Sequence, residues 1–172
     1  MGGSPEPKEM HMIRSTWAVV ATIAILASVP AVAHAGIIVE GSIGKGLQVS
    51  PSVDKNWGPT NFMIAPGLTI GQMLRAELGV VMDLPNNGIG TNLRLRPMLV
   101  VSPPIIPIYG RLIIGMANIL KGPRSFEYGA ALGVGASFAG IGLFAEAGVI
   151  PQLVGSQNTT LLEGRAGAFL IF

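Results

Sequence analysis

The sequence predicts an all-β fold: an eight-stranded antiparallel up-and-down barrel that spans a membrane, preceded by a signal-peptide helix. Three observations support this prediction. Apolar residues alternate with small or charged ones in eight segments of roughly ten residues, the length that a tilted strand needs to cross a bilayer. Only 12% of the 172 residues are charged, about half the usual share in a soluble domain. The chain also begins with an apolar leader that ends in a cleavage motif.

The leader is the first element of the chain. In "MIRSTWAVVATIAILASVPAVAHA", Arg14 supplies a positive charge, an apolar run follows it, and "AHA" ends the stretch as a small-x-small motif. A membrane anchor is the competing interpretation, but the apolar run is short for a spanning helix and Pro30 interrupts it. We therefore expect cleavage between Ala35 and Gly36, with residues 1–35 as signal peptide (Met10 or Met12 being the alternative starts) and residues 36–172 as the barrel domain.

Eight segments after the leader alternate with a period of two residues. In most of them one parity is almost wholly apolar, while the other carries Gly, Arg, Glu or Asp. In one such segment, for example, Leu74, Leu78 and Met82 oppose Arg75 and Glu77. The predicted strands are 37–49 and 60–70, where the pattern is less sharp, and then 74–83, 92–101, 108–116, 127–138, 141–152 and 162–172.

The connections between these segments are expected to alternate in length. Tight turns are predicted at Gly71-Gln72, Ser102-Pro103-Pro104 and Ala139-Gly140. Longer polar loops are predicted at "SPSVDKNWG", "PNNGIG", "KGPRS" and "GSQNTT". Short turns at one end and longer loops at the other are typical of outer-membrane barrels, with both termini on the periplasmic side.

The chemistry of the two parities indicates which one faces outward. A soluble barrel such as a lipocalin places its apolar parity inside and its charges outside. In this chain the charged parity is rich in Gly, which a narrow interior needs beside long Arg and Glu side chains. The other parity is a nearly uninterrupted band of Leu, Ile, Val, Ala and Phe. We therefore expect this band to face lipid, where only a closed barrel satisfies all backbone groups.

The inward parity is then expected to carry a network of ion pairs. Its charges nearly cancel, and an unpaired charge is costly at low effective dielectric. Eight strands leave an interior just wide enough to be filled by side chains, so a structural plug is the first interpretation and a narrow or gated polar pore the second. The predicted members are the acids Glu40, Glu77, Asp83, Glu127, Glu146 and Glu163 and the arginines Arg75, Arg94, Arg96, Arg111 and Arg165.

Three residues depart from the pattern. Lys45 falls on the outward parity, where we expect its ammonium to extend toward the outer membrane interface. Pro66 and Pro97 lie inside predicted strands, where each removes a ladder donor, and we expect bulges to accommodate them.

With its leader ending "AVAHA", its eight alternating segments, the stretch "VSPPIIPIYGRL" and the ending "FLIF", the chain resembles the small bacterial outer-membrane β-barrels. It is broadly similar to the OmpA transmembrane domain and to the OmpX and OmpW groups, over essentially all of residues 36–172. In such proteins a C-terminal aromatic strand is read by the barrel-assembly machinery. The resemblance implies this role for Phe172, with Leu170 and Ala168 on the same face. The chain departs from the family in its low aromatic content, 6%.

Enzymatic activity is not expected. Both His residues lie in the leader and there is no Cys, so the barrel lacks the usual general bases, thiol nucleophiles and most transition-metal ligands. We predict no catalytic residue, no metal and no cofactor. The net charge of +2 and the absence of a Lys/Arg run also argue against a nucleic-acid partner.

Two classes of function remain. The first is a structural or surface-interaction barrel with a plugged lumen, which uses the loops around Trp57, Asn86-Asn87 and Lys121–Arg124 to touch partners. The second is a narrow channel or a transporter of small solutes or ligands. For both classes we expect Sec-dependent export to the cell outer membrane of a Gram-negative bacterium. We expect contact with outer-membrane lipid and lipopolysaccharide, insertion by the barrel-assembly machinery, and a monomer.

Overall fold

The computed structural model of the chain describes residues 36–50, 57–84, 92–104, 106–120, 123–154 and 157–172. The predicted signal peptide, including Ala35, lies outside the described residues, and so do Asn86, Asn87 and Lys121. Within the described ranges, no helix is long and apolar enough to cross a bilayer.

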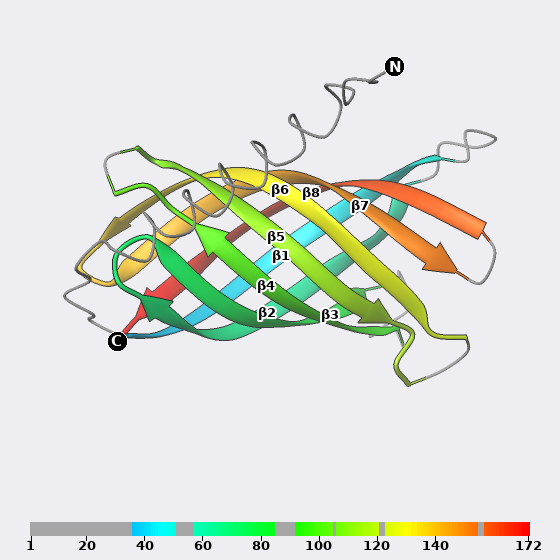
Figure 1. Cartoon of the computed structure of the whole chain (residues 1–172), viewed down its shortest axis with the longest axis horizontal. Coiled ribbons are helices and arrows are strands. Elements are labelled where there is room, and N and C mark those ends of the chain that lie inside the picture. Colours follow the sequence, from blue (N-terminus) through cyan, green and yellow to red (C-terminus); the bar gives the residue numbers. More distant parts are fainter. Residues whose placement is uncertain (1–35, 51–56, 85–91, 105, 121–122, 155–156) are drawn as a thin grey trace, which may run out of the picture. The chain divides into compact units, whose positions relative to one another are not determined.

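Eight antiparallel strands form one closed barrel in which each strand pairs with its sequence neighbours and β8 pairs with β1 (Figure 1). All eight predicted strands are present, and the predicted all-β barrel is confirmed. The strands are β1 (Gly36–Ser50), β2 (Trp57–Ile70), β3 (Leu74–Leu84), β4 (Leu93–Val101), β5 (Ile108–Ala117), β6 (Ser125–Phe138), β7 (Ile141–Val154) and β8 (Gln157–Ile171).

The last residue of the chain closes the barrel. The backbone N–H of Phe172 donates to the carbonyl of Ile37 at 2.9 Å, and the N–H of Ile37 donates to the carbonyl of Phe172 at 3.2 Å. Following paired residues from Gly36 around all eight strands leads back to β1 at Gly46, ten positions (46 − 36) farther along. This stagger means that the strands are strongly tilted, and tilted strands close a barrel of this size around a lumen that side chains can fill.

Burial alternates along the strands with the predicted parity. Arg96 is 1% exposed, whereas Leu132 is 71% exposed and Leu143 67%. The large apolar side chains of the outward parity cover the outer wall, and the arginines and acids point into the lumen. The barrel is therefore inverted relative to a soluble one, as the Gly-rich charged parity predicted.

The connections follow the predicted alternation only in part. Ala139 and Gly140 form the expected two-residue turn, with φ of 50° and 83°, the left-handed conformation of a tight hairpin. The loop predicted at "GSQNTT" is wrong for its last four residues, because β8 begins at Gln157; Gly155 and Ser156 lie outside the described residues. Asn158, Thr159 and Thr160 pair with β7. Their polar side chains suggested a loop, but the hydrogen-bonded ladder continues through them.

The turn predicted at Ser102-Pro103-Pro104 is longer than expected, since β4 ends at Val101 and β5 begins at Ile108. Prolines cannot donate to a ladder, so the strands separate here. Both ends of the connection are still held: the N–H of Ser102 donates to the carbonyl of Met73 at 2.7 Å, and that of Gly135 donates to the carbonyl of Pro107 at 2.8 Å.

Lys45 and the strand prolines all face outward. The Lys45 ammonium lies 5.7 Å from the centroid of the Trp57 ring, within range of a cation–π contact. The bulges expected at Pro66 and Pro97 are absent, because the β2–β3, β3–β4 and β4–β5 registers show no shift there. A proline lacks the backbone N–H, so one ladder hydrogen bond is absent at its position while the register of the two strands continues unchanged. The register shifts occur instead near the loop end of β1, between Lys45 and Leu47 and between Gln48 and Ser50.

Inward glycines allow close approach of neighbouring strands, and this generates a prediction. A Cβ at Gly129 would overlap the carbonyl oxygen of Val149, whereas one at the outward Gly164 would meet nothing within 4 Å. We expect Gly129→Ala to lower the free energy of unfolding by about 1–3 kcal/mol, as overpacking does. Gly164→Ala should leave it unchanged or raise it by up to about 1 kcal/mol. Urea titration of the barrel in lipid vesicles measures both, and equal midpoints would contradict the packing described.

Candidate functional site

The lumen is the candidate site, and side chains from all eight strands line it. The structure places all eleven predicted charged residues on the inward parity, together with polar partners from β1 and β2. The charged residues are Glu40 (β1), Arg75, Glu77 and Asp83 (β3), Arg94 and Arg96 (β4), Arg111 (β5), Glu127 (β6), Glu146 (β7), and Glu163 and Arg165 (β8).

Arg96 is the hub of the half of the network nearer the long loops. Its Nε donates to Glu127 Oε2 at 2.8 Å, and its two Nη atoms donate to the two oxygens of Glu163 at 2.8 and 3.1 Å. Arg94 donates to Asp83 and lies 3.8 Å from Glu127. The planar guanidinium fork suits such two-point contacts with carboxylates.

Arg165 connects this half to the other. It pairs with Glu163 and donates to Ser42 Oγ at 3.1 Å and to Asn61 Oδ1 at 2.7 Å. Its Nε also lies 3.9 Å from Glu146 Oε1. Pairs that would otherwise be separate are therefore joined into one continuous network.

Arg111 is the hub of the half nearer the short connections. It binds both oxygens of Glu40, at 3.0 and 2.7 Å. Its Nε lies 3.0 Å from Glu146 Oε2 and its Nη1 lies 3.4 Å from Glu77 Oε2, but neither contact has the alignment of a hydrogen bond. The Tyr109 hydroxyl donates a hydrogen bond to Glu146 Oε2 at 2.8 Å. Arg75 lies at the end of the network, with its Nε 3.5 Å from Glu77 Oε1.

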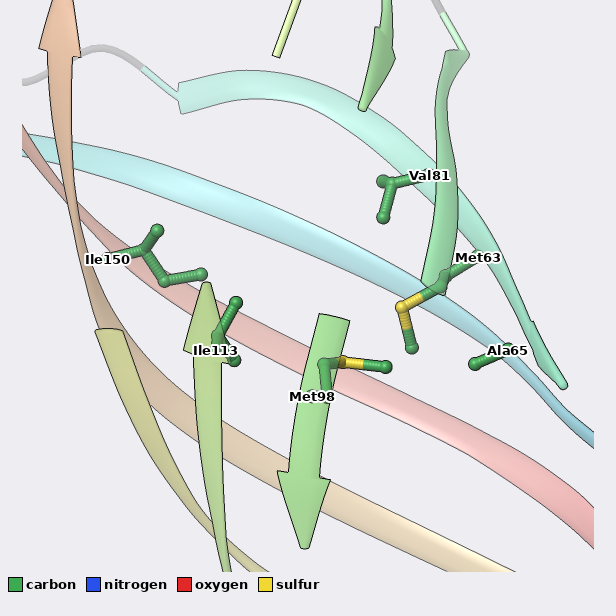
Figure 2. Packing of buried hydrophobic residues seen from close by; sticks show 6 residues of the cluster. All are labelled: Met63, Ala65, Val81, Met98, Ile113 and Ile150. Carbon is green, nitrogen blue, oxygen red and sulfur yellow. The ribbon is translucent and has the colours of Figure 1, made fainter. Parts of the chain in front are cut away.

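Two apolar clusters lie in the lumen among the charges, and the sequence analysis missed both. The first consists of residues from five strands, shown in Figure 2: Met63, Ala65, Val81, Met98, Ile113 and Ile150. The second lies nearer the short connections and consists of Ile38, Val100, Tyr109, Phe144 and Phe169. A signal was available, because Met98 and Val100 share the parity of Arg94 and Arg96, and Val81 shares that of Glu77 and Asp83.

Aromatic rings of the second cluster pack against two guanidinium groups. The Cζ of Arg111 lies 5.8 Å from the Tyr109 centroid and 5.5 Å from that of Phe144. The Cζ of Arg75 lies 5.7 Å from the Tyr109 centroid and 5.1 Å from that of Phe169. These contacts place the planar cations against ring surfaces, where arginine is attracted by the ring quadrupole.

The charged and apolar side chains in the middle of the lumen are buried. Glu40 and Glu127 are 0% exposed, and Arg96, Arg111 and Met63 are 1% exposed. A continuous water path along the axis would give these lining side chains measurable exposure. Ion pairs and apolar contacts therefore alternate along the lumen, and the side chains at its centre are buried.

A cavity of about 1010 Å³ opens at the short-connection end of the barrel. Arg75, Tyr109 and Phe169 line it from the lumen, and Pro103, Pro104 and Ile106 of the β4–β5 connection line it from the side. In the described part of the chain, no group of three or more His, Cys, Asp and Glu residues could hold a metal ion.

The three residues to which the resemblance gave an assembly role lie on the outer wall of β8 and at its end. Ala168 is exposed, Leu170 is 43% exposed and Phe172 75% exposed. Gly36, the residue after the predicted cleavage point, is the first residue of β1 and pairs with Thr69.

The buried hub generates a second prediction. Replacing Arg96 with Met leaves Glu127 and Glu163 without their main partner, and breaking a buried pair by removing one member costs about 3–5 kcal/mol. We expect the midpoint of urea unfolding in lipid vesicles to fall accordingly. The exposed Arg124→Gln, which removes the same charge from a loop, should change stability by less than about 0.5 kcal/mol. Similar midpoints for the two variants would mean that the lumen charges contribute nothing specific.

Comparison with known proteins identifies the fold. No family model and no curated protein sequence matches the chain. Among solved structures, the chain is similar to Neisserial surface protein A (NspA), with a TM-score of 0.56 and 17% identity over 79% of this chain and 97% of that one. The N-terminal β-barrel domain of Pseudomonas aeruginosa OprF aligns with a TM-score of 0.49 and 12% identity, over 80% of this chain and 99% of that domain. The likeness to NspA shows that the two chains share the fold of a small eight-stranded β-barrel.

Proposed function

We propose that the chain is an outer-membrane β-barrel of structural or surface-interaction type, with a lumen closed by its charge network. One observation carries the proposal: the barrel is apolar outside and charged inside. Phe138, Leu132 and Leu143 are 87, 71 and 67% exposed on the outer wall. In water this wall would be a continuous apolar patch far larger than soluble monomers expose. In a bilayer the same wall contacts the hydrocarbon chains of the lipid, and the closed barrel satisfies all backbone hydrogen bonds.

The closed lumen favours a structural role over transport. Conduction would require several buried ion pairs to separate and both apolar clusters to admit water. The cavity at the short-connection end does not extend past the buried hub at Arg111, which is 1% exposed. The alternative, a narrow channel or small-solute transporter, would need the network to rearrange.

The remaining parts of the proposal concern location and partners. We place the chain in the outer membrane of a Gram-negative bacterium after Sec-dependent export, as a monomer. Lys45 and Trp57 lie on the outer wall at the loop end, where a cation and an aromatic ring suit the headgroup region and the phosphates of lipopolysaccharide. The exposed Arg124 supplies a second cation at that end. The barrel-assembly machinery is the proposed partner of Phe172 during insertion.

Planar-bilayer recording tests the closed lumen. We expect the purified wild-type barrel to give no conductance steps above baseline. A variant with Arg96, Glu127 and Glu163 all replaced by Ala, shown to be folded by heat-modifiability on gels, opens only the half nearer the long loops. It should also give no conductance steps, because Arg111 and the second apolar cluster still close the other half. Stable conductance steps from the wild-type protein would overturn the plug and favour the channel.

Removal of Phe172 tests the location and the assembly role. We expect this deletion to reduce the heat-modifiable, outer-membrane-fractionated protein several-fold, because it removes both the proposed signal and the backbone pair with Ile37. Deletion of the exposed loop residue Arg124 is the control of equal size and should leave the amount nearly unchanged. Equal amounts of the two variants in the outer-membrane fraction would contradict the assignment.

A further inference from the structure

The lumen contains six acids and five arginines, and the excess acid can be assigned to one half of the network. The half nearer the long loops is balanced, with three acids and three arginines. The half nearer the cavity has three acids but only two arginines. The three acids are Glu40, Glu77 and Glu146, and the two arginines are Arg75 and Arg111.

Hydrogen bonding distinguishes the three acids. Glu40 holds both Nη atoms of Arg111. Glu146 accepts a hydrogen bond from the Tyr109 hydroxyl and lies near Arg165. Glu77 accepts no hydrogen bond on either oxygen, although its side chain is 0% exposed. The neighbouring Nε of Arg75 also lacks a partner, so the Arg75–Glu77 contact is poorly aligned.

An ionised carboxylate in this position is strongly disfavoured. Burial without hydrogen bonds removes the hydration of the charge, and the contacts with Arg75 and Arg111 replace it only in part. The groups that face Glu77 are Arg75 on its own strand, Glu40 from β1, Arg111 from β5 and Glu146 from β7. Arg111 is already engaged by Glu40 and Glu146, and a third carboxylate around one arginine meets like charge. Only an added positive charge makes this half neutral.

We propose that Glu77 is a proton-binding site, whose carboxyl group holds one proton at neutral pH and exchanges it with solvent in the cavity at the short-connection end. Protonation forms one O–H bond on a carboxylate oxygen and breaks one O–H bond of a hydronium ion, which becomes water, and deprotonation reverses both changes. The Arg75 guanidinium separates Glu77 from the cavity, because it lines the cavity and its Nε lies 3.5 Å from Glu77. Arginine has no acceptor for a proton, so the exchange takes place when this side chain moves and admits water to Glu77. The proposal is independent of whether the barrel has a surface partner.

Infrared difference spectroscopy of the intact barrel in lipid vesicles tests the site. At pH 7 we expect a carboxylic-acid C=O band in the wild-type protein that shifts in D₂O and is absent from Glu77→Gln. Asp83→Asn, at the far end of the network, should retain the band. Glu40→Gln should lose it although Glu77 is intact, because Arg111 is then free to pair with Glu77. A wild-type spectrum without the band, or a band that survives in Glu77→Gln, would overturn the proposal.

Stability against pH provides a readout that does not depend on the band. Because the folded state favours the protonated form, wild-type stability should fall as the pH rises through the deprotonation of Glu77. Glu77→Gln has the same shape as the protonated acid, so it should fold and lack this dependence. A small alkali cation could supply the same positive charge. Stabilisation of the wild type by NaCl but not by choline chloride, lost in Glu77→Gln, would mean that sodium rather than a proton occupies the site.

Discussion

Eleven charged side chains enclosed by the narrow barrel are the constraint on which the rest of the structure depends. The two hub arginines find partners across the lumen that lie far apart in the sequence: 67 residues separate Arg96 from Glu163 and 71 separate Arg111 from Glu40. A one-residue slip of any strand would turn its charges outward, toward the apolar wall. The ion pairs therefore select one register for all eight strands, and the closure between Ile37 and Phe172 completes it.

The same pairs explain how a polar lumen can be closely packed. Guanidinium groups fill space between the strands, aromatic rings cover their faces, and inward glycines such as Gly129 allow the neighbouring backbone to approach. Apolar side chains then occupy the remaining volume in two clusters. Replacing a buried network with apolar residues is often neutral or stabilising, so the charges are better understood as determinants of register and of closure than as a source of net stability.

Much of this fold followed from the period of two residues. Alternation predicted the eight strands, the faces of Arg75 and Glu77, and the outward band. The partners could not be predicted, because the ten-residue stagger decides which side chains meet across the lumen, and no local pattern encodes it. The apolar clusters were not predicted because the inward parity was assigned from its charged residues alone. Met98 and Val100 share that parity, but apolar residues are common on both faces of a strand. Asn158 to Thr160 were misassigned since the polar character of a strand end resembles that of a loop.

The inverted arrangement of the barrel is tested most directly by asking which solvent touches the outer wall. Trp57 is the only tryptophan of residues 36–172, so Trp57→Phe provides a background for a single tryptophan at Leu132 or Leu143, both on the outer wall. In vesicles of lipid brominated on the acyl chains, we expect strong quenching of both tryptophans and little quenching by aqueous iodide. Strong iodide quenching with no effect of the brominated lipid would mean that the wall faces water and that the barrel does not span a membrane.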